Sequence, residues 1–207
     1  MHDLYQSIRP IMTSATMIGY FVGVLPITCI VGILYELFRY VYLVKKQIKS
    51  KRSTEIIRFL FVCYLTGLFN LLIVPLGIWT NIFDGIFFGW WEEMKPLFQL
   101  GDVNLVPTLV KYLHGEVTLG SWVKQMLVGN ILMFMPFGFF LPFVTNKVRK
   151  SNIALLAAII PLVFELLQLI LGRAFDTDDL ICNFLGIVAG WFTALLVKRV
   201  FKIRELS

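Results

Sequence analysis

The chain has 207 residues and a formal net charge of +6; 58% of its residues are hydrophobic and only 15% are charged. So few charged residues cannot cover a soluble globule of this length, and the composition excludes that class. It indicates an integral membrane protein. We assign its positive charge to cytoplasmic loops and to attraction for anionic lipid, and we expect no nucleic-acid partner.

Five apolar segments are long enough to cross the hydrocarbon layer as helices, which takes about 20 residues each. In chain order they lie at about 17–38, 59–80, 122–144, 153–172 and 180–198. Each segment is apolar on every face, whereas the strands of a membrane barrel would alternate. We therefore predict an all-α, multi-pass bundle of about five transmembrane helices.

Lysine and arginine residues are concentrated at one end of these helices. Thirteen of them fall in segments 45–58 and 145–151 and in the C-terminal tail, against five in the segments at the opposite end. Short loops rich in lysine and arginine remain in the cytoplasm. This distribution predicts an N-terminus outside the membrane and a cytoplasmic C-terminus.

The predicted spans suggest two parts, with two helices and a basic cytoplasmic loop in residues 1–80 and three helices in residues 81–207. The second part opens with an external loop, 81–121, in which Asp84, Glu92, Glu93, Asp102 and Glu116 are acidic and Phe83, Phe87, Phe88, Trp90, Trp91 and Phe98 are aromatic. Such a loop is expected to lie along the outer membrane interface. Within it, Asn104-Leu-Val-Pro107 predicts a turn that leads into a short helix.

Polar residues interrupt the last three predicted helices near their outer ends. Glu165 lies in an otherwise apolar stretch, and an ionisable group at that depth must face protein or water. At 100° per residue, Glu165, Gln168 and Gly172 form one stripe, which we expect to face the bundle interior. Asn130 in the third helix and Asn183 in the fifth lie at a similar predicted depth.

Two further features predict how the helices bend and pack. Pro161, four residues before Glu165, is expected to bend the fourth helix. Gly186 and Gly190 share one face of the fifth helix, and this spacing lets a neighbouring backbone approach closely. Close packing within the bundle is the simplest explanation, and dimerisation through these glycines is the alternative.

These depths predict that one set of residues meets at the outer ends of the last three helices. We call it the polar cluster: Asn130, Glu165, Gln168, Arg173, Asp176, Asp178, Asp179 and Asn183. Arg173 and the three aspartates would form its lid, and the site would open outward. Two explanations stay open, namely a ligand-binding pocket and an internal network that only joins helices, with Arg173 neutralising Asp176 or Asp179.

The residues of the polar cluster also carry a family resemblance. Over residues 104–190, the motifs Asn104-Leu-Val-Pro107, Asn130-Ile-Leu-Met-Phe-Met-Pro136-Phe-Gly138, Glu165-x-x-Gln168 and Gly172-Arg173-x-Phe-Asp176-x-Asp178-Asp179-x-x-x-Asn183-x-x-Gly186 occur in order. Together they resemble the VanZ-like family of bacterial membrane proteins. The resemblance implies a place in the bacterial cytoplasmic membrane. It also implies a role in low-level resistance to teicoplanin without remodelling of the peptidoglycan terminus.

The first functional hypothesis is binding or displacement of a lipid-linked ligand, which could be a membrane lipid, a lipoglycopeptide or a lipid-linked cell-wall precursor. Arg173 would contact a carboxylate or phosphate through its planar fork. Glu165 and Gln168 would hydrogen-bond the polar head, while Asn130 and Asn183 orient them. No cofactor is expected, and homo-oligomerisation stays open.

The second hypothesis is a hydrolase or transferase that acts on a lipid-linked envelope substrate. Glu165, Asp178 and Asp179 would be its catalytic candidates, with a divalent ion held by these aspartates and Asp176. Against it, the two histidines lie outside the cluster, and Asp178 or Asp179 before the last helix could simply cap its N-terminus. The third hypothesis is a partner-binding module in which the acidic aromatic loop contacts another envelope protein.

Overall fold

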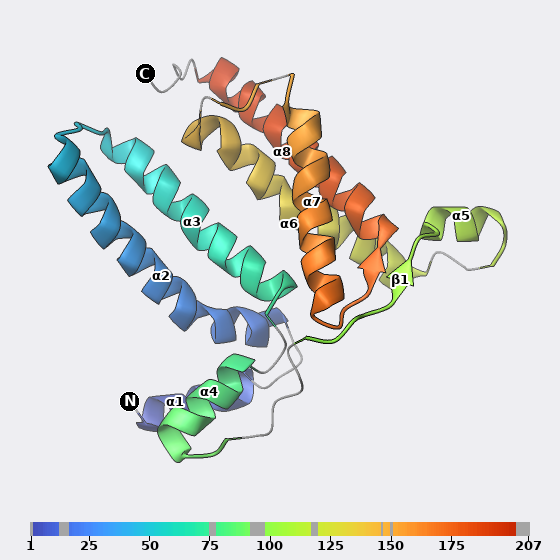
Figure 1. The fold of residues 1–207 in the computed structure, drawn as a ribbon, viewed down its shortest axis with the longest axis horizontal. Helices are drawn as coiled ribbons and strands as arrows, with labels where there is room; N and C mark the ends of the chain where they lie inside the picture. The colour runs from blue at the N-terminus through green and yellow to red at the C-terminus, as the bar shows by residue number, and fades with distance from the viewer. Residues whose placement is uncertain are drawn as a thin grey trace. The chain divides into compact units, whose positions relative to one another are not determined.

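The computed structural model describes residues 2–12, 17–74, 78–91, 98–116, 120–145, 147–149 and 151–201. These form helices and one short two-stranded sheet (Figure 1). The helices are α1 (His2–Met12), α2 (Met17–Lys46), α3 (Arg52–Leu72), α4 (Ile78–Phe88), α5 (Thr108–Leu113), α6 (Ser121–Val144), α7 (Ile153–Ile170) and α8 (Thr177–Val200). The strands are β1 (Val103–Asn104) and β2 (Phe175–Asp176), which pair in parallel.

Five of these helices, α2, α3, α6, α7 and α8, are long and apolar enough to cross a membrane. The predicted all-α fold with five spans is therefore confirmed, while the orientation of the termini stays a prediction. Three boundaries were wrong. α3 ends at Leu72 instead of near residue 80, and the residues from Ile78 onward belong to α4. At the basic ends, α2 continues to Lys46 and α3 begins at Arg52. Helical hydrogen bonding continues into interfacial residues whose long side chains reach water, so a helix extends beyond its apolar centre.

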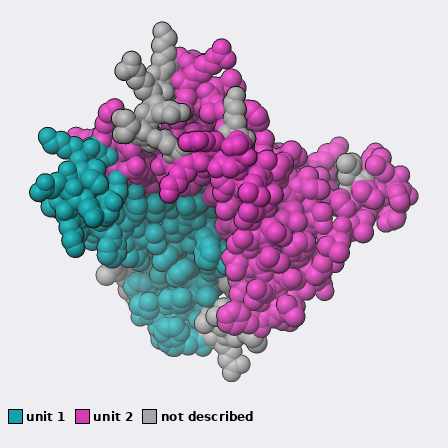
Figure 2. All heavy atoms as spheres, turned by 45° about the horizontal axis from the view of Figure 1, so that its top comes forward, with its two compact units in different colours: residues 1–50, 62–97 teal, residues 51–61, 98–207 magenta. Residues whose placement is uncertain are grey.

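The chain divides into two compact units, which Figure 2 colours teal and magenta. Unit 1 comprises Met1–Ser50 and Val62–Leu97, and unit 2 comprises Lys51–Phe61 and Phe98–Ser207. The start of α3 belongs to unit 2, where the ring of Phe61 contacts the rings of Phe137 and Phe140 in α6. The predicted division at residue 80 stays a prediction.

The core of unit 2 depends on an unusually close approach of α6 and α8. A Cβ atom added to Gly186 or Gly190 of α8 would collide with the backbone carbonyl oxygen of Ile131 or Met135 in α6. Gly138 of α6 meets the carbonyl of Ile187 in the same way. The expected close packing at Gly186 and Gly190 is confirmed, and the partner on this face is α6 of the same chain.

The third helix of the unit, α7, buries one narrow stripe. Its buried residues are Ile153, Ala157, Pro161, Glu165 and Gln168. Their spacing of three or four residues places them on one helix face, while leucines and isoleucines on the other faces are exposed. The expected inward stripe is thus confirmed for Glu165 and Gln168, and Pro161 lies within the same helix.

Unit 1 contains a helix pair that the sequence did not predict. In α1, Tyr5 and Arg9 both donate to the buried carboxylate of Asp84 in α4; each of the three hydrogen bonds measures 2.8 Å, and Arg9 is bidentate. The ring of Tyr5 also stacks on that of Phe87. Part of the expected external loop is therefore a helix, and Asp84 is an internal partner instead of an exposed loop acid. Glu92 and Glu93 lie outside the described residues.

We predict that α6 and α8 tolerate no added methyl group at their contact. Gly190→Ala should lower the free energy of unfolding by about 1–3 kcal/mol or more, because backbone atoms leave no room to repack. Gly129→Ala in α6 is the matched control, since nothing lies within 4 Å of its added Cβ. Thermal unfolding in detergent checks both, and equal effects would contradict this packing.

We also predict that the contact between α1 and α4 depends on pH at both extremes. The Arg9 guanidinium lowers the pKa of Asp84 below its ordinary 3.8, and burial and the bond to Asp84 raise the pKa of Tyr5 from 10.0 to about 12. The depressed Asp84 pKa stabilises the fold above pH 3.8, and this contribution is lost as pH falls through the folded value. The raised Tyr5 pKa stabilises it below pH 10.0, and this contribution is lost as pH rises towards 12.

Unfolding temperatures measured across pH should therefore fall at both ends. Asp84→Asn should remove the acid limb of this dependence, and Tyr5→Phe the alkaline limb. Unchanged limbs in these variants would show that other groups control the pH dependence.

Candidate functional site

A tight turn after α7 brings the polar cluster together. Gly172 has a φ of +78°, a conformation that favours glycine. The backbone N–H of Arg173 donates to the carbonyl of Gln168 over 2.9 Å, and that of Gly172 donates to Leu169 over 3.4 Å, which together form a Schellman motif. The stripe therefore ends before Gly172, and the expectation that Gly172 belongs to it was wrong because this residue reverses the chain.

An extended segment before α5 runs parallel to this turn. The N–H groups of Gln99 and Gly101 donate to the carbonyls of Ile170 and Leu169 over 3.1 and 2.9 Å. Further along, Asn104 of β1 pairs with Asp176 of β2. A Cβ atom on Gly101 would collide with the carbonyl oxygen of Arg173, so only glycine fits at that point. Residues 99–104 thereby satisfy carbonyl groups at the exposed end of α7.

Asp176 joins three elements at the centre of the cluster. Its backbone N–H donates to Glu165 Oε2 of α7 over 3.0 Å. Its Oδ1 atom accepts from the N–H of Asp178 over 2.9 Å and so caps α8, and its Oδ2 atom accepts from Asn104 Nδ2 over 3.1 Å. The expectation that Asp178 or Asp179 caps this helix was wrong, because α8 starts earlier and both lie in its first turn.

Asp178 holds the beginning of α5. Both of its carboxylate oxygens accept from the backbone N–H of Thr108, over 3.0 and 2.8 Å. Lys111 of α5 donates to Asn104 Oδ1 over 2.9 Å, and Thr177 Oγ1 donates to the Asn104 carbonyl over 3.1 Å. Asp178 is itself buried, so it anchors a neighbouring segment and is not part of an exposed lid.

Sequence reasoning did not assign Asn104, Thr108 or Lys111 to the site. The motif that begins at Asn104 marked a turn and a short helix, both of which the structure contains. It gave no sign that this turn pairs with a segment more than 70 residues later, since the bond between Asn104 and Asp176 spans 72 positions. The available signal was Asn104 itself, a polar residue directly before the apolar run Leu105 to Pro107.

The remaining residues of the polar cluster either connect α6 with α8 or lie buried among the helices of unit 2. Asn130 Nδ2 of α6 donates to Asp179 Oδ1 of α8. Glu165 is 1% exposed, and Gln168 and Asn183 are each 3% exposed. The Oδ1 atom of Asn183 has no hydrogen-bond donor among the residues that the structure describes. The last three predicted spans, α6, α7 and α8, therefore all contribute to one buried polar region.

The accessible part of the cluster is small and carries both signs of charge. Arg173 is exposed, and Asp176 and Asp179 are partly buried. Arg173 interacts favourably with the charges of Glu165 and Asp179. A ligand that approaches from outside the protein would meet Arg173 and the two aspartates before it reached the buried Glu165.

The three aspartates do not converge as ligands of one ion. Their carboxylates are directed to Asn104 and the α8 N-terminus, to Thr108, and to Asn130. In the described part of the chain, no three His, Cys, Asp or Glu side chains are grouped so that they could hold a metal ion. The arrangement does not favour the ion-dependent form of the enzyme hypothesis.

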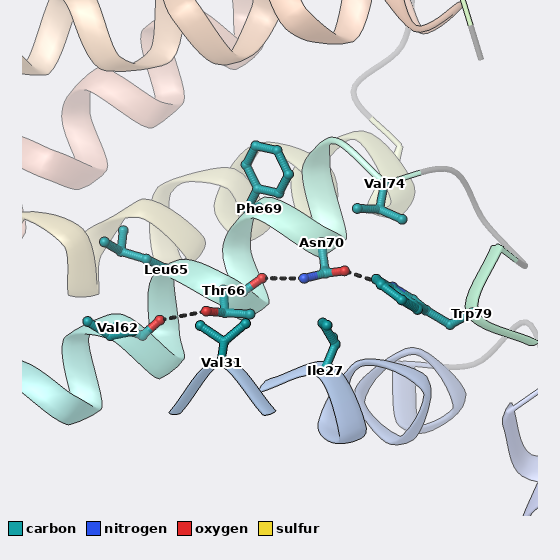
Figure 3. Close-up of a pocket in the computed structure, with 9 residues that line it drawn as sticks. All are labelled: Ile27, Val31, Val62, Leu65, Thr66, Phe69, Asn70, Val74 and Trp79. Carbon is teal, nitrogen blue, oxygen red and sulfur yellow. Dashed lines mark hydrogen bonds between the residues drawn. The ribbon is translucent and has the colours of Figure 1, made fainter. Parts of the chain in front are cut away.

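Unit 1 has a separate apolar groove of about 480 Å³ between α2, α3 and α4 (Figure 3). Its polar side chains already have partners. Thr66 Oγ1 donates to the Val62 carbonyl over 2.9 Å, and Asn70 donates to the Thr66 carbonyl and accepts from Trp79 Nε1 over 2.8 and 2.7 Å. The groove therefore presents almost only hydrocarbon, in contrast to the polar cluster.

Comparison with known proteins gives a family. Neither a search of curated proteins nor a search of solved structures found a match. The model of the family described as VanZ/LLP1 matches residues 28–198, which include α3 to α7, the whole polar cluster, the larger part of α2 and nearly all of α8. This membrane protein therefore belongs to the VanZ-like family.

Proposed function

We propose that this protein, placed in the bacterial cytoplasmic membrane, binds or displaces a lipid-linked ligand at the outer end of α6, α7 and α8. Through this activity it would contribute to low-level resistance to teicoplanin-type lipoglycopeptides, as its family membership suggests. The observation that carries the proposal is Glu165, an ionisable side chain that is 1% exposed in the last third of a spanning helix. Ionisable residues at such positions usually serve a function.

The cluster is more extensive than the joining of helices requires. Helix packing in unit 2 is already provided by the glycine contacts between α6 and α8. Polar bonds between spans contribute only about 0.6 kcal/mol each on average, whereas an unsatisfied polar group in hydrocarbon costs several kcal/mol. A network of four carboxylates therefore brings the cost of any unsatisfied polar group without a matching gain in stability. This favours a functional role for the network.

In this proposal, the exposed Arg173 makes the first contact, with a phosphate or carboxylate of the ligand. Asp176 and Asp179 lie beside it, while Glu165, Gln168 and Asn183 form the buried floor. Asn104, Thr108 and Lys111 hold the surrounding backbone in place. A ligand with an acyl chain and a polar head suits a site whose polar groups open beside lipid-exposed helix faces.

The proposal requires an outward-facing cluster, which labelling can test. In a Cys29→Ser, Cys63→Ala background, a membrane-impermeant maleimide should label Glu116→Cys in intact cells, because this exposed residue follows α5. It should label Arg149→Cys, between α6 and α7, only after permeabilisation. The reverse pattern would place the cluster on the cytoplasmic side and contradict the proposal.

The binding role itself is tested by Arg173→Ala and Glu165→Gln. Each change removes a charged partner worth about 1.5–3 kcal/mol, so ligand affinity should fall about tenfold or more. We expect cells that produce either variant to lose the protein's effect on teicoplanin susceptibility, and the purified variants to retain less co-purifying lipid by mass spectrometry.

Arg149→Ala is the matched control, since it removes an exposed arginine at the opposite ends of α6 and α7. It should behave like the wild type. If Arg173→Ala and Glu165→Gln accumulate normally in the membrane and change neither susceptibility nor retained lipid, the proposed function is wrong.

A further inference from the structure

The side-chain oxygen of Asn183 is buried and accepts no hydrogen bond from the residues that the structure describes. The residue is 3% exposed within a spanning helix, and none of the described residues donates to its Oδ1 atom. A buried acceptor without a partner is costly, because neither lipid nor a packed core can replace the lost hydrogen bond to water. This position is therefore suited to a donor that comes from a bound molecule.

Helix geometry directs this amide into the polar cluster. Asn183 lies one turn after Asp179, and residues four apart on a helix share a face. On that face Asp179 accepts from Asn130 of α6, and three residues after Asn183 the backbone of Gly186 meets Ile131 of α6. The Asn183 side chain is thus enclosed between helices, next to the carboxylate of Asp179.

The cluster as a whole has more acceptors and more negative charge than its own donors match. It contains four carboxylates, of Glu165, Asp176, Asp178 and Asp179, and its cations are Arg173 and Lys111, of which Lys111 donates to Asn104 Oδ1. Backbone N–H groups and asparagine amides, which carry no charge, donate to these carboxylates, and Arg173 interacts with the charges of Glu165 and Asp179. A cationic group with N–H donors, placed beside Asn183, would supply the missing donor and put positive charge directly next to these carboxylates.

We propose that the ligand of this site carries a primary ammonium group beside a phosphate, as in an ethanolamine phospholipid. This inference rests on the proposed lipid-binding function and specifies its ligand class. The ammonium donates to Asn183 Oδ1 and offsets the carboxylates of Glu165 and Asp179, while the phosphate contacts Arg173. A choline headgroup has the charge but no N–H donor, and a glycerol headgroup has hydroxyl donors but no positive charge.

The test compares headgroups on the purified full-length protein in a neutral detergent. Dioleoyl phosphatidylethanolamine, phosphatidylcholine and phosphatidylglycerol are added separately, and soluble phosphoethanolamine supplies the same headgroup without acyl chains. Native mass spectrometry measures the bound lipid. We expect phosphatidylethanolamine to bind about tenfold more tightly than the other two lipids, because charge-assisted hydrogen bonds are lost with either of them. Soluble phosphoethanolamine should bind much more weakly.

Asn183→Leu separates binding from folding. It removes the unpartnered acceptor, so the unfolding temperature without lipid should stay equal or rise, while the preference for phosphatidylethanolamine falls. Trp191→Phe is the matched control, because Trp191 Nε1 is also buried without a partner among the described residues but lies roughly 12 Å further along α8. This variant should keep the wild-type preference.

The outcomes distinguish this inference from the function on which it rests. Equal binding of the three lipids, or a preference for phosphatidylglycerol, overturns the ammonium proposal but leaves a lipid site that Arg173→Ala should weaken. No specific lipid binding overturns both proposals. If soluble phosphoethanolamine binds as tightly as phosphatidylethanolamine, the proposal that the headgroup comes from a lipid is wrong. An unchanged preference in Asn183→Leu overturns the role of Asn183, and if this variant does not fold, the wild-type lipid series decides.

Discussion

Polar groups inside a membrane span cannot be hydrated by the bilayer core, so each must find its partner within the protein or in a ligand. Glu165 meets this requirement through the backbone N–H of Asp176, which follows the turn at Gly172. Because the carboxylate of Asp176 also caps α8 and binds Asn104, this one residue fixes α7, α8 and the extended segment together. The geometry of the whole cluster depends on it.

The close approach of α6 and α8 makes the second half of the cluster feasible. Glycines at positions 138, 186 and 190 let backbone meet backbone, and this brings Asn130 within hydrogen-bonding reach of Asp179. A larger side chain at any of these positions would separate the helices and break a polar bond several residues away. Packing and polar chemistry are therefore coupled in unit 2.

The polar cluster has features of both explanations, the ligand-binding pocket and the internal network that joins helices. Asp178 and Asn104 mainly hold neighbouring segments, as an internal network would require. The interaction of Arg173 with the charges of Glu165 and Asp179 also fits an internal network. The acceptor of Asn183, which no described residue satisfies, is not explained by such a network. An exposed arginine and a buried acceptor without a described donor support the ligand-binding role we propose.

The sequence alone determined the five spans, the inward stripe of Glu165 and Gln168, and the glycine face of α8, because each depends on length, hydropathy or helical spacing. Only the tertiary structure decided which residues bond across the chain. Asn104 meets Asp176 over 72 positions, Thr108 meets Asp178 over 70, and Arg9 meets Asp84 over 75. Local sequence patterns do not indicate which distant residues will pair, because these contacts form only when helix ends and turns pack together.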